Sequence, residues 1–105
     1  MTVYVDEAIW VWKGRRWCHL MADDLFELHR FAHRLGLQLS SYQGPPKTSA
    51  PHYDITGFER SRAIRLGAVP IGRRETVQLF RAQKSPRALL APRIRVAREP
   101  ALTRA

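Results

Sequence analysis

Residues 51–68 decide the fold, and they read Pro-His-Tyr-Asp-Ile-Thr-Gly-Phe-Glu-Arg-Ser-Arg-Ala-Ile-Arg-Leu-Gly-Ala. This stretch holds an extended segment, a helix start, a short helix and a helix stop in one uninterrupted run. Thr56 and Glu59 have the spacing of a capping box, and Gly67 supplies the left-handed stop. The stretch therefore predicts an extended segment that leads directly into a helix over residues 57–66.

His52 and Asp54 alternate around Tyr53 in this stretch. On an extended segment, residues two apart project to the same face. A polar pair of this kind, held against a helix start, suits an anion, a metal ion or a proton in transit. A structural role, in which the pair caps the helix and ties down the preceding loop, is also open.

A hairpin is predicted nearer the N-terminus, after a first strand over residues 2–5. Residues 9–12 and 17–20 alternate on either side of a break that contains Gly14. Three tryptophans interleave here with three cations, a pattern that favours stacking on bases, since every nucleotide offers the π-face of its base to an aromatic ring and its phosphate to a cation. The other interpretation is that the rings form the core of a small sheet. The ligand-binding candidates on this hairpin are Trp12, Arg15, Arg16 and Trp17.

Two further helices complete the predicted architecture. Capping-box spacing at Asp24 and Glu27, an apolar stripe and a stop at Gly36 predict a helix over residues 23–35. Residues 73–83 carry a third helical pattern, and residues 37–42 have weak strand character. The fold class predicted is α+β: a small, mainly antiparallel sheet with an N-terminal hairpin, covered by helices near 23–35, 57–66 and 73–83.

Length and charge set the domain organisation. The 105 residues have room for one core, which we assign to a single domain over residues 1–83. Residues 84–105 hold six of the basic residues, one acid and three prolines, and we expect a disordered or extended tail. The net charge of +9 favours nucleic acid or another polyanion as a partner, or simply keeps the protein in solution.

Several protein classes are disfavoured. There is one cysteine, no signal-peptide pattern and no apolar run of membrane-spanning length, so we expect a soluble cytoplasmic protein without a membrane partner. Known nucleophile, phosphate-loop and dinucleotide motifs are absent. These absences favour a binding module over an enzyme. The sequence makes no cofactor evident, and a divalent metal ion is the one cofactor that its candidate residues would suit.

Three separated segments carry a family resemblance. They are Met-Thr-Val-Tyr-Val-Asp at 1–6, Trp-Cys-His-Leu-Met-Ala-Asp at 17–23 with Glu-Leu-His-Arg-Phe-Ala-His-Arg-Leu-Gly-Leu at 27–37, and Pro-His-Tyr-Asp-Ile-Thr at 51–56 with Arg-Ala-Ile-Arg-Leu-Gly-Ala at 62–68. Over about residues 1–80 the chain resembles a small bacterial and phage family catalogued as domain of unknown function 4031. The resemblance implies no activity, but it draws attention to Asp6, His19, Asp23, His52, Tyr53, Asp54 and Arg62.

These residues support three hypotheses of function. The leading one is a binding domain for nucleic acid or a phosphorylated ligand, which would use the hairpin with Arg62, His52 and Tyr53. Arg62 falls in an apolar arc of its predicted helix with Phe58, Ala63 and Leu66. It must therefore reach solvent with its head group or find an anionic partner, for which Asp54, Asp6 or a ligand phosphate would serve.

The alternative is a metal-dependent hydrolase or nuclease with His19, His52 and Asp54 as its catalytic residues. Its metal ligands would come from Asp6, His19, His52 and Asp54. His52 could also act as a general base oriented by an aspartate. The third hypothesis is a protein-interaction module with exposed tryptophans, and the oligomeric state stays open.

Overall fold

The computed structural model describes residues 2–7, 10–48 and 50–83. Within these ranges the chain forms a six-stranded sheet, three α-helices and one short 3-10 helix, η1. The strands are β1 (Val3–Val5), β2 (Trp10–Trp12), β3 (Arg15–Ala22), β4 (Tyr42–Gln43), β5 (His52–Thr56) and β6 (Val69–Pro70), and the helices are α1 (Leu25–Leu35), η1 (Leu39–Ser41), α2 (Gly57–Arg65) and α3 (Arg73–Ala82). The predicted tail over 84–105 and residue 9 of the predicted hairpin lie outside the described residues.

The long strand β3 organises the sheet, whose strand order is β4-β5-β3-β1-β6. On one edge, the start of β3 pairs with β2 and its end pairs with β1, both antiparallel. The other edge pairs antiparallel with β5, which in turn pairs with β4. Among the described strands, β1 and β6 alone pair in parallel. The predicted α+β class and the mainly antiparallel sheet are therefore confirmed.

Lys13 and Gly14 form the tight turn of the N-terminal hairpin. Both have positive φ angles, 52° and 74°, and Trp12 and Arg15 face each other across the turn. Two consecutive residues with positive φ suit the right-handed twist of a two-residue hairpin, and glycine accepts this conformation without a Cβ penalty. The hairpin predicted from the alternation around Gly14 is thus present, with its tip formed by a lysine and a glycine.

Local capping sets the starts of α1 and α2. The Asp24 carboxylate accepts a hydrogen bond from the Glu27 backbone N–H at 2.8 Å. Thr56 and Glu59 make both hydrogen bonds of a capping box, because each side chain accepts from the other residue's backbone N–H. The helices begin and end within two residues of the predicted bounds. None of the helices in the described ranges is long and apolar enough to span a membrane.

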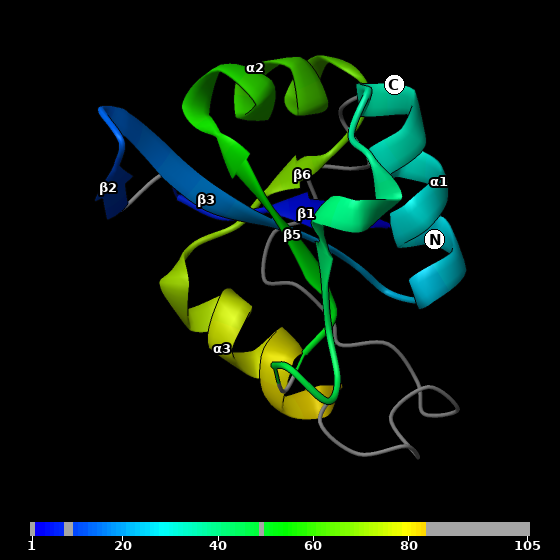
Figure 1. Ribbon diagram of the computed structural model, residues 1–105. Coiled ribbons are helices and arrows are strands. Elements are labelled where there is room, and N and C mark those ends of the chain that lie inside the picture. The colour runs from blue at the N-terminus through cyan, green and yellow to red at the C-terminus, as the bar shows by residue number, and fades with distance from the viewer. Residues whose placement is uncertain (1, 8–9, 49, 84–105) are drawn as a thin grey trace.

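The sheet separates two apolar clusters, and Figure 1 shows α2 above it and α3 below it. The larger cluster packs α1 and α2 on one face through residues that include Val5, Cys18, Leu20, Leu28, Ile55 and Ala63. The smaller cluster packs α3 on the other face through Tyr4, Met21, Val69, Ile71, Leu79 and Phe80. Because side chains alternate along a strand, Cys18 and Leu20 face α1 and α2, whereas His19 and Met21 face α3.

Cys18 is fully buried in the larger cluster. Burial, with a smaller contribution from the charge of Asp6, raises the pKa of its thiol to about 12. The thiol therefore stays protonated at neutral pH and acts as a small apolar core residue.

Candidate metal centre

Three metal-ligating side chains converge on the α3 face of the sheet. His19 of β3 lies opposite Asp54 of β5 in the strand register, and His52 stands two residues before Asp54 on the same strand. Strand alternation and cross-strand pairing therefore put all three side chains on one face. One potential ligand atom from each of them lies within 4.8 Å of the others.

The ring of His52 is oriented by a backbone carbonyl. Its Nδ1 donates to the Ala50 oxygen at 2.9 Å, since a carbonyl can only accept. In the neutral ring, Nε2 then carries a lone pair, and it lies 3.4 Å from the Asp54 Oδ1 atom. Two acceptors at this separation need a proton or a metal ion between them. Two ligands on a tetrahedral zinc ion would be separated by a similar distance, about 3.3 Å.

Protonation of His52 is correspondingly favoured. Burial lowers the pKa of His52, but its hydrogen bond to Asp54, that to Ala50 and the nearby negative charges outweigh burial and leave the pKa raised. Burial likewise raises the pKa of Asp54, and hydrogen bonds from His52 and Gln43 outweigh it, so the pKa of Asp54 is lowered. Both shifts favour a protonated His52 beside an ionised Asp54, and a divalent cation can take the place of the proton.

Asp6 orients the ring of His19. One carboxylate oxygen accepts from the His19 backbone N–H at 2.7 Å, and the other accepts from His19 Nδ1 at 2.6 Å. Asp6 is only 4% exposed, and the Arg60 guanidinium donates to its backbone carbonyl at 2.6 Å. A carboxylate bound to Nδ1 leaves Nε2 as the nitrogen available to a metal ion and fixes the orientation of the ring.

Asp54 is held from its other side. The Gln43 side-chain amide of β4 donates to Asp54 Oδ2 at 2.6 Å, which leaves Oδ1 facing His52. All three potential ligands are thus fixed by a hydrogen bond to a neighbouring group. Asp6 is one of these supporting groups and not a fourth ligand, because its carboxylate is already engaged with His19.

Aromatic rings form the walls around the two imidazoles. Phe80 of α3 has its ring centroid 5.3 Å from that of His19 and 5.7 Å from that of His52. On the other side, Trp10 lies 4.9 Å from His19. The His52 side chain is 10% exposed, whereas those of His19 and Asp54 are 24% and 31% exposed. The cluster is therefore walled by apolar rings and open to solvent on the side of His19 and Asp54.

Three residues singled out in the sequence lie outside this cluster. Tyr53 is buried on the opposite face, where its hydroxyl pairs with His29 Nδ1 at 2.8 Å. Asp23 accepts from the Thr2 backbone N–H and the Tyr4 hydroxyl, both at 2.9 Å, so it ties the end of β3 to β1. Arg62 lies on α2, which packs on the face of the sheet opposite His52.

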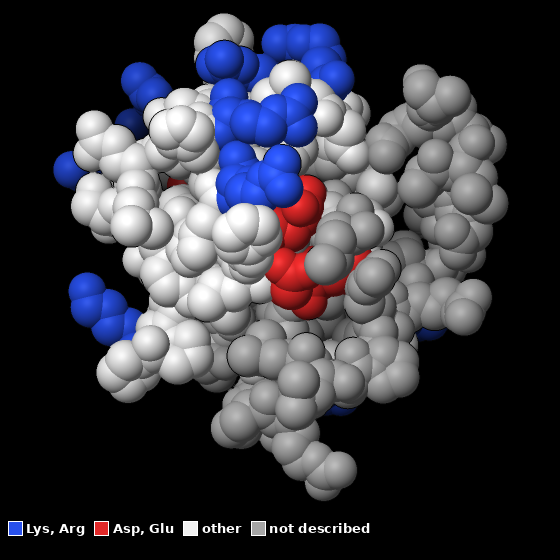
Figure 2. All heavy atoms as spheres, turned by 90° about the vertical axis from the view of Figure 1, so that its right-hand side faces the viewer, with Lys and Arg blue, Asp and Glu red and all other residues white. Residues whose placement is uncertain are grey.

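The apolar arc predicted for α2 is wrong at Phe58 but holds at Ala63 and Leu66. Phe58 is 91% exposed, and Arg62 is exposed as well. The helix packs on the core through Ala63 and Leu66, as predicted, and also through Ile64. Arg62 is exposed to solvent and so needs neither Asp54 nor Asp6 as a partner. On the face seen in Figure 2, basic side chains gather toward the top.

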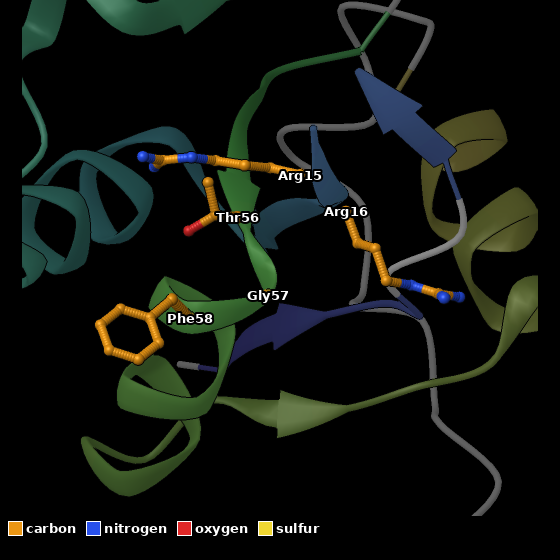
Figure 3. A pocket seen from close by; sticks show the side chains of 5 residues that line it. All are labelled: Arg15, Arg16, Thr56, Gly57 and Phe58. Atoms are coloured by element: carbon orange, nitrogen blue, oxygen red, sulfur yellow. The ribbon is translucent and has the colours of Figure 1, made fainter. Parts of the chain in front are cut away.

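The two hairpin arginines do not converge on one point. Together with Thr56, Gly57 and Phe58 they line a pocket of about 470 Å³ at the start of α2. Figure 3 shows Arg15 extended beside Thr56, while the guanidinium of Arg16 points the opposite way. The capping box already engages the backbone N–H groups of Thr56 and Glu59. This pocket therefore lacks the paired cations that would clamp a phosphate.

The tryptophans do not form the core, contrary to one interpretation of the hairpin. Trp12 is 55% exposed, and Trp10 and Trp17 are partly exposed. None of the three rings belongs to either apolar cluster of the described residues.

Sequence reasoning missed the groups that orient the ligands: Gln43, the Ala50 carbonyl and the wall residue Phe80. Gln43 belongs to a strand of two residues, too short to show a period, and a carbonyl carries no sequence signal. Phe80 lies in the third predicted helix, and nothing in the sequence connects it with the histidines.

Taken together, the fold and the cluster define a small α+β domain with a His-His-Asp cluster on the α3 face of its sheet, across the neighbouring strands β3 and β5. Residues 3–83 match the family described as protein of unknown function (DUF4031), and the chain belongs to this family. No curated protein and no solved structure matches the chain.

Proposed function

We propose that this domain binds one divalent transition-metal ion through His19, His52 and Asp54 and uses it to activate water for hydrolysis. The observation that carries the proposal is the way the two imidazoles are held. Each donates its Nδ1–H to a fixed acceptor, Asp6 or Ala50, so that Nε2 is left for the metal. Supporting acceptors of this kind accompany metal-bound histidines in general.

The donor set favours zinc or iron. Two imidazoles and one carboxylate make the three-ligand set of hydrolytic zinc sites and of non-haem iron sites, which keep coordination positions open. Purely structural zinc sites have four protein ligands and are closed. The partial exposure of His19 and Asp54 leaves access for a water molecule and a substrate.

The chemistry that follows is hydrolysis of an ester. A metal ion held by His19, His52 and Asp54 would supply an activated water, and the oxygen of this water would bond to the electrophilic centre of the substrate. The bond to the leaving oxygen breaks, and that oxygen takes the electron pair and a proton. In this scheme Asp6 and Gln43 are positioning residues, because they act through His19 and Asp54.

Equilibrium dialysis of the full chain against Zn²⁺, Mn²⁺ and, without oxygen, Fe²⁺ tests the proposal. We expect one ion per chain, loss of binding in His52→Ala and His19→Ala, and unchanged binding in His33→Ala, which removes an exposed histidine of α1. Circular dichroism confirms that each variant is folded. Equal metal content in wild type and both ligand variants would refute the site, and a loaded protein that leaves an activated phosphodiester intact would refute the hydrolysis.

A second candidate function is the binding of nucleic acid or a phosphorylated ligand without chemistry. It is favoured by the exposed hairpin, where the Lys13 ammonium lies 4.6 Å from the Trp12 ring centre. Binding of this kind should weaken steeply with salt, since phosphate contacts release counterions. An affinity that does not change between low and high salt would remove the electrostatic part of this function.

A further inference from the structure

A second recess adjoins the candidate metal centre. It has a volume of about 360 Å³ and is lined by Trp10, Val11, Trp12, Trp17 and Asp54. Asp54 belongs to both sites, and the Trp10 ring contacts the His19 ring. Ligand pockets in proteins begin at roughly 300 Å³, so the recess can take a ligand of nucleotide size.

The indole rings of this recess are held in place. Trp17 Nε1 donates to the Trp12 carbonyl at 2.9 Å, and the two rings meet edge to face with centroids 5.8 Å apart. Trp10 stands opposite Trp17 in the strand register. Rings fixed by the backbone of a hairpin lose little freedom when a ligand stacks on them, which favours affinity.

The charge around the recess selects the ligand. The hairpin brings the cations Lys13 and Arg15 beside Trp12, and the acid that lines the recess, Asp54, is the residue that it shares with the candidate metal centre. The Lys13 ammonium lies over the Trp12 ring, and Arg15 pairs with Trp12 across the turn. Flat apolar surfaces with cations beside them match a molecule that has aromatic rings and negative charges.

We propose that the recess stacks a base of single-stranded nucleic acid and so brings the neighbouring phosphodiester to the metal centre. Base stacking on exposed aromatic rings is the usual means by which proteins hold single strands. A paired strand does not fit, because its bases are already stacked inside the duplex. The hydrolytic part rests on the proposed function, but the stacking does not.

The resulting reaction is cleavage of the strand by water. The oxygen of the activated water bonds to phosphorus, and the bond from phosphorus to the sugar oxygen of the leaving strand breaks. That oxygen takes the electron pair and a proton, which leaves one phosphate monoester and one hydroxyl end.

Tryptophan fluorescence of the full chain, titrated in EDTA with an oligothymidine of about ten nucleotides, tests the stacking. An abasic oligonucleotide of equal length carries the same phosphates and reports binding by charge alone. We expect the thymidine strand to bind tighter than the abasic strand, and Trp12→Ala to weaken thymidine binding roughly tenfold or more. Trp12→Phe should restore most of it, and Phe58→Ala, which removes an exposed ring outside the recess, should change nothing.

The outcomes separate this inference from the metal proposal. Equal affinity for the two strands, or no effect of Trp12→Ala, overturns the stacking even where metal binds. The exposed hairpin would then be expected to bind a protein. Base-dependent binding by a chain that takes up no metal supports the stacking and removes the cleavage. Base-dependent binding with metal-dependent cleavage of the single strand, lost in Asp54→Asn, supports both.

Discussion

Asp6 is the residue on which the orientation of His19 depends, and it carries the first prediction. Asp6→Asn keeps an oxygen for the His19 backbone N–H but removes the charge that holds Nδ1–H. Loss of such a supporting carboxylate lowers metal affinity roughly 10- to 100-fold. Competition with a chromophoric chelator measures this change.

Asp23→Asn is the matched control for Asp6→Asn. Asp23 also accepts hydrogen bonds from a backbone N–H and from a side chain, but its two donors are Thr2 and Tyr4, at the start of β1. We expect Asp23→Asn to lower the melting temperature and leave metal affinity unchanged. Equal losses of affinity in the two variants would mean that Asp6 acts on the fold and not on His19.

The His52 and Asp54 pair predicts how stability depends on pH in metal-free protein. The folded-state pKa of His52 lies above its ordinary value of 6.5, so its contribution is complete below pH 6.5 and is lost as pH rises through the folded-state pKa. The folded-state pKa of Asp54 lies below 3.8, so its contribution is present above pH 3.8 and is lost at lower pH. The pair therefore stabilises the fold most between about pH 3.8 and 6.5.

Urea denaturation in EDTA at several pH values measures this dependence. Wild type should lose stability above pH 6.5 relative to Asp54→Asn, which lacks the charge that holds the His52 proton. Zinc should reverse the trend, because metal binding displaces the proton and so strengthens as pH rises. A difference between the two proteins that stays constant from pH 5 to 8 would contradict the assignment.

At the scale of elements, the hairpin turn controls the Trp recess. Gly14 has a φ of 74°, and a Cβ added there would meet no atom within 4 Å. The cost of Gly14→Ala is therefore conformational, about 1–2 kcal/mol in the free energy of unfolding. We expect looser hairpin strands, weaker oligonucleotide binding and unchanged metal affinity, because β5 holds His19 from the other side.

Gly36→Ala provides the comparison for Gly14→Ala. Gly36 has a φ of 95°, equally open surroundings and a place at the end of α1, away from the recess. Chemical denaturation should show a similar loss of stability in both variants, and fluorescence titration should show weaker oligonucleotide binding in Gly14→Ala alone. Weaker binding in both would trace the effect to global stability.

Elements with local signals could be predicted from the sequence. The capping pairs at Asp24 and Thr56 predict α1 and α2 because they bond within one turn, and the hairpin follows from alternation around Gly14. Residues 37–42 were expected to have strand character, but η1 occupies Leu39–Ser41 and β4 begins only at Tyr42. A two-residue strand exists through its pairing with β5, and a single segment cannot reveal that pairing.

The candidate site, like the fold, was predictable only where local signals exist. Alternation places His52 and Asp54 on one face, and the family resemblance drew attention to Asp6 and His19. Arg62 was misplaced because a helical wheel does not show which face of α2 meets the core. Contacts between distant segments, such as those from Gln43 and Phe80, appear only once the sheet is assembled.

In the whole molecule, one face of the sheet carries the larger core and the other carries the candidate metal centre, and the last prediction compares the two faces. Leu28 is buried in the cluster that packs α1 and α2, whereas Phe80 of α3 touches both imidazoles. Leu28→Ala should cost about 2–5 kcal/mol of unfolding free energy but leave the metal affinity of the folded protein unchanged.

Phe80→Ala should cost less stability, because its side chain is only partly buried, and yet weaken metal binding. Without this ring, water reaches His19 and His52, and the imidazoles lose a wall that holds their orientation. Urea denaturation and chelator competition on both variants, under conditions where each is folded, measure the two effects separately. If metal affinity falls in proportion to the lost stability in both variants, then metal binding depends on the stability of the whole fold and not on the α3 face alone.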